Sequence, residues 1–165
     1  PMIIKSRSIT KNHAINVLEY VIREEKDHIV LDSDGADISS AYTFIGDSSL
    51  YKKDRVTKAF VSKVISPHAK DKLNKKDLKN LLHEVFREMK LDNRQFFAVI
   101  HQNTDTPHIH VISNRIDYDY NTWNDHHVAF TCQRTCKNVS NKLGLIYAND
   151  LQGNYDGKGK EKCIS

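Results

Sequence analysis

Residues 96–115 read FFAVIHQNTDTPHIHVISNR, and this stretch decides both the fold and the chemistry that we expect. The apolar run from Phe96 to His101 is typical of a buried strand. Residues 102–107 have turn character, and a second strand is predicted over His108–Ile116. If the connection folds as a hairpin, the two strands pair side by side in an antiparallel sheet.

The histidines of this stretch are spaced for a metal site. His108 and His110 are separated by one residue, so on a strand both imidazoles project from one face, while Ile109 and Val111 take the other. In a hairpin, His101 lies opposite this pair, with Cβ atoms about 4.5–5.5 Å apart. Nine histidines in 165 residues make some clustering expected by chance. A same-face pair with a third histidine across the hairpin nevertheless favours an open, catalytic type of metal site.

The rest of the chain alternates between strands and helices, which indicates an α+β domain with a mostly antiparallel sheet and helices over one face. Residues 27–55 give only short strands or loops of weak register. The other expected elements, in chain order, are a strand at residues 2–4, a helix around 14–22 capped by Ser8 or Thr10, a strand over 58–65, and helices over 74–91 and 127–143, the last ended by Gly144.

Composition is ordinary for a globular protein, with 39% hydrophobic and 28% charged residues. No apolar run is long enough for a membrane span and no signal peptide opens the chain, so we expect a cytoplasmic protein. The net charge of +4 permits a polyanionic partner without requiring one. We expect one domain over residues 2–150 and a flexible, Gly- and Lys-rich tail over 151–165, and we expect the natural protein to start at Met2 and leave open that it continues past residue 165.

The segment from His101 to Arg115 resembles the third motif of plasmid mobilisation relaxases, whose pattern is H-x(6–7)-H-x-H on adjacent strands. Residues 20–26, YVIREEK, resemble their first motif, in which a tyrosine on an early helix is the nucleophile. The tyrosine precedes the histidines, as in relaxases, whereas it follows them in replication initiators of the same HUH superfamily. The resemblance covers residues 2–145 and implies a ferredoxin-like antiparallel sheet with helices packed on it.

Helical phase supports Tyr20 independently as the nucleophile. The apolar stripe of the first helix centres near Ala14 and Val21, and Tyr20 falls about 130° from that centre. A tyrosine that packs in the core would lie on the stripe. The alternative is an ordinary surface tyrosine, and Tyr118 and Tyr120 are rival nucleophiles that could instead stack on DNA bases or pack at a sheet edge.

The resemblance implies metal-dependent, strand-specific nicking at an origin of transfer, with a 5′-phosphotyrosine link that is later rejoined. His101, His108 and His110 would bind the metal. Three imidazoles suit Zn²⁺, Co²⁺, Ni²⁺ or Mn²⁺, whereas the family and cellular availability favour Mn²⁺ or Mg²⁺. Asp105, in the turn, either supports catalysis by orienting a histidine or stabilises the turn.

The expected partners are single-stranded origin DNA and accessory proteins of the relaxosome, and no membrane. The candidate DNA contacts are Arg23, Lys58, Asn114 and Arg115, with a wider basic stretch that runs from Lys52 to Lys63. Two other functions stay open. One is a metal-dependent phosphoesterase that activates water and uses no tyrosine, and the other is a non-catalytic DNA-binding accessory module.

Overall fold

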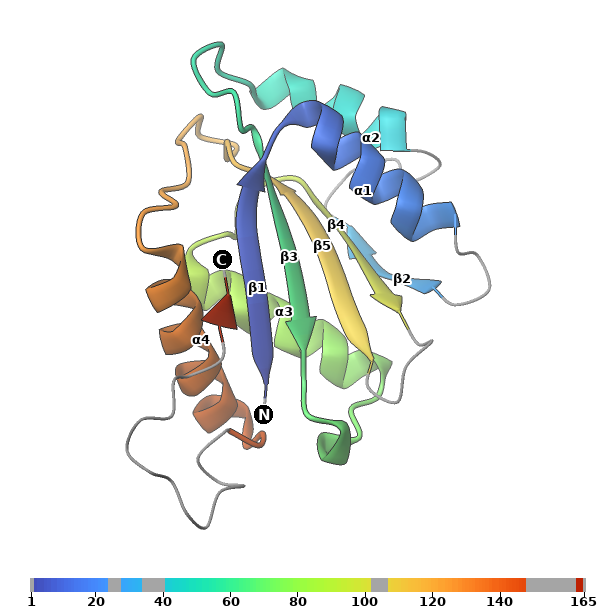
Figure 1. Cartoon of the computed structure of the whole chain (residues 1–165), viewed down its shortest axis with the longest axis vertical. Coiled ribbons are helices and arrows are strands. Elements are labelled where there is room, and N and C mark those ends of the chain that lie inside the picture. The colour runs from blue at the N-terminus through green and yellow to red at the C-terminus, as the bar shows by residue number, and fades with distance from the viewer. Residues whose placement is uncertain (1, 24–27, 34–40, 102–106, 148–162, 165) are drawn as a thin grey trace.

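The structure is a computed structural model that describes residues 2–23, 28–33, 41–101, 107–147 and 163–164. At its centre is a sheet in the order β2-β4-β5-β3-β1-β6 (Figure 1). The strands are β1 (Ile3–Ile9), β2 (His28–Ser33), β3 (Phe60–Ser66), β4 (Phe96–His101), β5 (His108–Asn114) and β6 (Cys163–Ile164). The helices are α1 (Lys11–Arg23), α2 (Ala41–Ser48), α3 (Lys75–Met89) and α4 (Val128–Leu143), with the 3-10 turns η1 (Ser49–Tyr51) and η2 (Ala69–Asp71).

The sheet is the ferredoxin-like, mostly antiparallel sheet that the sequence predicts. Every neighbouring pair among β1 to β5 is antiparallel, and only the two-residue β6 lies parallel to its neighbour, β1. Strands β4 and β5 pair directly, with His101 opposite His108 and Val99 opposite His110. The predicted hairpin is therefore confirmed. Apart from β6, the tail lies outside the described residues, so its flexibility stays a prediction.

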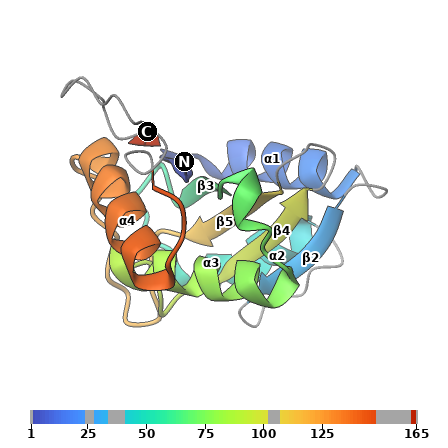
Figure 2. The ribbon, with the colours of Figure 1, turned by 90° about the horizontal axis from the view of Figure 1, so that it is seen from below.

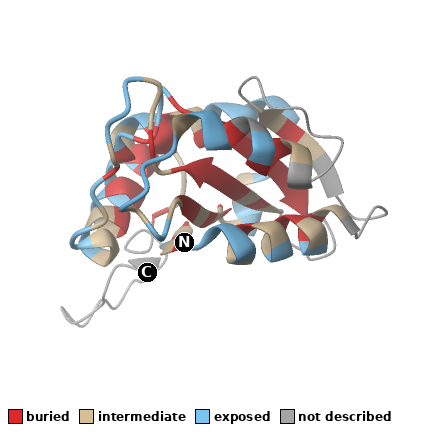
Figure 3. Cartoon of the chain, turned by 90° about the horizontal axis from the view of Figure 1, so that it is seen from above, coloured by how far each residue is buried: buried red, intermediate tan, exposed pale blue. Residues whose placement is uncertain are grey.

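Helices cover both faces of the sheet, and the expectation of helices over one face is wrong. On one face α3 and α4 pack on a core that includes Val61, Ile109 and Val111. On the other, α1 and α2 pack on a second core that includes Phe97 and Ile112. Figure 2 shows the sheet between α1 and α3, and Figure 3 shows its central strands buried. The reason is that β4 and β5 carry apolar side chains on both faces, and each face must be shielded from water.

Local signals set the ends of the long helices as expected. Asn74 caps α3 in a reciprocal capping box with Asp77, and Gly144 ends α4 in the left-handed conformation. At α1, the backbone N–H of His13 donates to Thr10 Oγ1 at 3.3 Å, so Thr10 rather than Ser8 is the cap. No helix in the described part of the chain is long and apolar enough to cross a membrane.

Helix α2 is a helix that the sequence did not predict. It runs over Ala41–Ser48, within the region expected to hold only loops or short strands. Phe44 and Ile45 are buried in the core beneath α1, at 1% and 3% exposure. Helices this short form only with tertiary packing, because nucleation is costly. Contact with α1 and the sheet therefore stabilises α2 more than its own sequence does.

Candidate active site: histidines beneath the first helix

His101, His108 and His110 lie on the same face of the sheet, the face that α1 covers. Side chains alternate between the two faces along a strand. Val99 is two residues from His101 and Ile112 is two residues from His110, so these two share the histidines' face, and both belong to the core under α1. Ile109 and Val111 point the other way, into the core under α3 and α4. The predicted division of β5 into a histidine face and an apolar face is confirmed.

Two of the three histidines are in direct contact. The ring centroids of His101 and His110 are 4.3 Å apart, with the planes inclined by 47°. His101 is only 6% exposed, and its Nε2 is buried without a hydrogen-bond partner among the described residues. A buried ring nitrogen without a partner is destabilising unless a bound group satisfies it. The pair thus offers a buried ring nitrogen, His101 Nε2, that is available to bind a metal ion.

His108 is oriented by a residue of a third strand. Its Nδ1 lies 2.8 Å from Ser66 Oγ, at the end of β3. The sequence does not indicate Ser66 as a site residue, because nothing local shows that β3 pairs with β5. Ile65 is the last residue of β3 that pairs with β5 and lies opposite Ile109, so the next residue, Ser66, falls at the position of His108. The strand register is therefore the signal that would have identified Ser66.

Burial favours the neutral form of two of the three histidines, His108 and His110, by lowering the pKa of each. Burial, followed by the charges of His101 and His108, lowers the pKa of His110 to about 4. Burial also lowers the pKa of His108, with smaller contributions from the charges of His101 and Lys5. Neutral imidazole is the form that binds metal ions.

The described residues do not form a closed metal cage. Among them, no group of three His, Cys, Asp or Glu side chains is close enough to hold one ion. His101 and His110 contact each other, whereas His108 hydrogen-bonds Ser66. Asp105 lies outside the described residues, so its role stays a prediction.

Tyr20 lies on α1, close to its C-terminal end, with its side chain 61% exposed. Ala14, Leu18 and Val21 form the buried face of the helix, so Tyr20 is off that face as its helical phase predicts. Val17 and Val21, one turn before Tyr20 and one residue after it, line a small cavity together with His110. Tyr20 therefore extends from the part of α1 that covers His110.

Two of the predicted DNA-contacting residues have structural roles. Asn114 is 2% exposed, and its amide donates to the backbone carbonyls of Ser48 and Tyr51. Arg115 donates through Nε and Nη2 to the carbonyl of Trp123 and through Nη1 to that of Lys58. Contact of the Asn114 amide with DNA would require these bonds to break, whereas Arg115 keeps N–H groups that these bonds do not use.

The basic residues before and within β3 differ in exposure. Lys58 is exposed and available to a phosphate. Lys63 is 1% exposed and donates to Ser6 Oγ at 2.8 Å, so the prediction that it belongs to a DNA-contacting stretch is wrong. Lys63 is two residues from Val61 on β3, so both side chains point to the same face, toward the core under α3 and α4. Arg23 ends α1, and its side chain lies outside what the structure describes.

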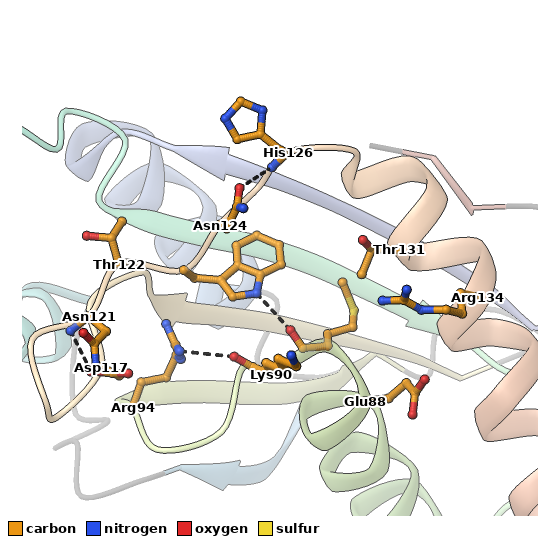
Figure 4. A pocket seen from close by; sticks show the side chains of 12 residues that line it. Glu88, Lys90, Arg94, Asp117, Asn121, Thr122, Asn124, His126, Thr131 and Arg134 are labelled. Carbon is orange, nitrogen blue, oxygen red and sulfur yellow. Dashed lines mark hydrogen bonds between the residues drawn. The ribbon is translucent and has the colours of Figure 1, made fainter.

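A separate polar pocket of about 360 Å³ lies between the end of α3, the loop after β5 and α4 (Figure 4). Trp123 and Arg94 lie in it. Trp123 Nε1 donates to the carbonyl of Met89, and Arg94 donates to the carbonyls of Lys90, Asp92, Asn114 and Arg115. These side chains are engaged in holding the loop, and the pocket is on the opposite side of the sheet from the histidines. It is therefore no part of the candidate active site.

Comparison with known proteins identifies the family to which the chain is similar. Residues 20–145 match the sequence profile of the family described as relaxase, MobA/VirD2-like, nuclease domain. No curated protein sequence matches the chain.

Two similar solved structures are of the MobM relaxase domain (MOBV; Mob_Pre) with origin-of-transfer (oriT) DNA of plasmid pMV158. The one with 26-nucleotide DNA has a TM-score of 0.59 at 10% identity, covering 98% of this chain and 95% of that one. The other, a Mn-bound crystal structure with 22-nucleotide DNA, has a TM-score of 0.63 at 11% identity, covering 98% and 94%. At these identities the likeness shows a shared fold.

Proposed function

The chain belongs to the MobA/VirD2-like relaxase family, as a nuclease domain, and we propose that Tyr20 is its nucleophile and that His101, His108 and His110 bind its divalent metal ion. As a relaxase the protein is an enzyme that nicks DNA for mobilisation. The proposal adds the chemistry by which the nick is made. It also assigns that chemistry to residues on two facing elements, the β4–β5 hairpin and α1.

The observation that carries the metal proposal is the buried Nε2 of His101. It has no hydrogen-bond partner among the described residues, and the ring lies against His110, whose pKa of about 4 keeps it neutral. A metal ion would satisfy a ring nitrogen that is otherwise buried at a cost. When bound, the ion would polarise the phosphate oxygens and offset the negative charge that develops in the transition state.

The residue types support Mn²⁺ as the first ion to test. Imidazole nitrogen favours Mn²⁺, Co²⁺, Ni²⁺ or Zn²⁺ over Mg²⁺, which prefers oxygen ligands. One of the similar MobM structures is Mn-bound, which agrees with this preference. Mg²⁺ is the alternative working ion, because phosphate oxygens of the substrate would complete its coordination.

The tyrosine hydroxyl supplies the covalent step. The oxygen of Tyr20 attacks the scissile phosphorus, and the bond from phosphorus to the 3′-oxygen breaks. The products are a 5′-phosphotyrosine and a strand with a free 3′-hydroxyl, and the phenol proton leaves in the same step. Because phenolate is also a fair leaving group, the 3′-hydroxyl can attack in reverse and restore the strand. A phenol is a poor nucleophile at neutral pH, so the step needs a nearby cation or base.

The substrate that we propose is single-stranded DNA at an origin of transfer. The MobM domains of similar fold are bound to oriT DNA, and the exposed Lys58 is suited to a phosphate contact. Accessory proteins of a relaxosome are proposed partners on the basis of the family alone.

The test is capture of the covalent intermediate. Overlapping single-stranded oligonucleotides from the element that encodes the chain are incubated with the protein and Mn²⁺, denatured, and analysed by gel and by peptide mass spectrometry. We expect a DNA-linked band whose adduct maps to Tyr20. Tyr20→Phe removes the hydroxyl and should abolish the band, whereas Tyr147→Phe, a change at a core tyrosine, should retain it.

Other outcomes separate the alternatives. An adduct on Tyr118 or Tyr120 would overturn the assignment of Tyr20. Cleaved DNA without any linked protein would indicate a phosphoesterase that activates water. If calorimetry detects no Mn²⁺ binding to the wild-type chain, the proposal that the histidines bind this ion fails.

A further inference from the structure

Three tyrosines form a cluster at the end of the sheet opposite the histidines. The ring of Tyr51, in η1, lies 5.0 Å from that of Tyr118 and 5.5 Å from that of Tyr120, between centroids. Figure 1 shows η1 and the loop after β5 at the same end of the sheet. Strand β5 has seven residues, from His108 at one end to Asn114 at the other. This length separates His108 from the tyrosine end by about 20 Å, and His110 by about 13 Å.

The cluster is held rigidly. The amide of Asn114 donates to the carbonyl of Tyr51 at 3.2 Å, which ties η1 to the end of β5. In the loop, Asp117 Oδ1 accepts from the backbone N–H groups of Asp119 and Asn121, and the N–H of Tyr120 donates to the carbonyl of Asp117. The two segments therefore present their rings on a fixed backbone, so little conformational freedom is lost when a ligand binds.

Tyr120 adopts a conformation that is unfavourable for an aromatic residue. Its φ is +63°, in the left-handed region, where glycine or asparagine is accommodated at lower cost. Its side chain is 53% exposed, so burial compensates for only part of that cost. Strained residues of this kind are concentrated at functional sites. The exposed ring is therefore a candidate for binding rather than for folding.

The surroundings of the cluster favour an anionic polymer. Exposed cations follow Tyr51 directly at Lys52, Lys53, Arg55 and Lys58, with Asp54 the one acidic residue among them. Tyr51, Lys52 and Lys53 also border a pocket of about 260 Å³ that includes Lys11. Asp119 accepts a hydrogen bond from Asn93, and Asp117 is engaged in the loop. Asp117 and Asp119 keep their negative charge, but the four cations at residues 52, 53, 55 and 58 outnumber the three carboxylates at residues 54, 117 and 119.

We propose that Tyr51, Tyr118 and Tyr120 form a stacking platform for the bases of single-stranded DNA outside the nicking site, with the adjacent lysines on its phosphates. The inference rests on the proposed function for the identity of the polymer. Aromatic rings beside a basic surface are a common means of binding single strands, because every base has a face that can stack. The platform would hold the strand at a distance from the nick and would be tolerant of sequence.

The test separates stacking from charge. Fluorescence anisotropy measures binding of oligo(dT) of about 20 nucleotides, and of an abasic strand of the same length, in EDTA at low salt. We expect Tyr120→Asn to weaken oligo(dT) binding about tenfold and to leave abasic binding unchanged. Because asparagine suits the left-handed conformation, the same variant should unfold at an equal or higher temperature. Phe130→Ala removes an exposed aromatic from α4 and should bind both strands as the wild type does.

The proposal is overturned if wild type and Tyr120→Asn bind oligo(dT) equally, or if the wild type does not prefer oligo(dT) to the abasic strand. Either result would show that the cluster does not stack on DNA bases, and a protein would then be the partner to test. The assay contains neither metal ion nor origin sequence, so it does not depend on nicking. Absence of a Tyr20 adduct would therefore not count against the stacking platform. Equal binding by wild type and Tyr120→Asn would in turn not count against Tyr20 as the nucleophile.

Discussion

At the scale of single residues, the orientation of His108 depends on one hydroxyl group. Ser66 Oγ lies 2.8 Å from Nδ1 of the ring. When Nε2 is free to bind a metal ion, Nδ1 carries the proton and donates to Ser66. Histidines that bind metals usually make such a second bond, which fixes the ring and its tautomer.

Ser66→Ala should therefore lower the affinity for Mn²⁺ about tenfold without unfolding the protein. Titration calorimetry measures the affinity, and circular dichroism checks the fold. Ser62→Ala is the matched control, because Ser62 lies on the same face of β3 and its hydroxyl has no hydrogen-bond partner among the described residues. Equal affinities for the two variants would show that Ser66 does not position a metal ligand.

At the scale of elements, a charged group joins the two helices that cover the far face of the sheet. Glu84 of α3 contacts Lys142 of α4 at 2.9 Å and Arg87 of its own helix at 2.6 Å. The hydrogen bond from Lys142 is the main reason that the pKa of Glu84 is lowered, with the charges of Arg87 and Lys142 adding to it and burial opposing it. The carboxylate form is therefore favoured in the folded state.

Glu84→Gln should reduce the free energy of unfolding by about 0.5–1 kcal/mol near neutral pH, since both cations are largely exposed. A lowered pKa means that this stabilisation is complete above the ordinary carboxyl value and disappears as pH falls through the folded-state value. Urea denaturation at about pH 7 and about pH 3 measures the difference. A wild-type advantage that persists undiminished at the lower pH would contradict the role given to the charge.

At the scale of the whole molecule, metal binding and folding are linked. The three histidines come from two adjacent strands and lie under α1, so only the folded chain brings them to one face of the sheet. An ion that binds the folded state alone stabilises it by about 2.7 kcal/mol at a concentration 100 times its Kd. For a chain of this length, that corresponds to a rise in Tm of about 5–10 °C.

We therefore expect Mn²⁺ to raise the Tm of the wild type and to leave that of His101→Ala unchanged, measured by scanning calorimetry with and without EDTA. Removing His101 also removes its buried Nε2, and loss of that atom costs the metal-free variant no hydrogen bond among the described residues. An equal Mn²⁺ shift in both proteins would place the binding elsewhere on the chain.

The sequence alone determined the features that depend on neighbours a few residues apart. Alternation in β5 gave the histidine face, helical phase gave the exposure of Tyr20, and local caps set the ends of α3 and α4. Only the tertiary structure decided which strands adjoin beyond the β4–β5 hairpin, that helices cover both faces, and that α2 exists. It also decided the roles of Ser66, Lys63 and Arg115, whose partners His108, Ser6 and Lys58 lie 42, 57 and 57 residues away. The physical reason is that periodicity fixes the direction in which a side chain points, whereas its partner depends on packing between segments that no local pattern relates.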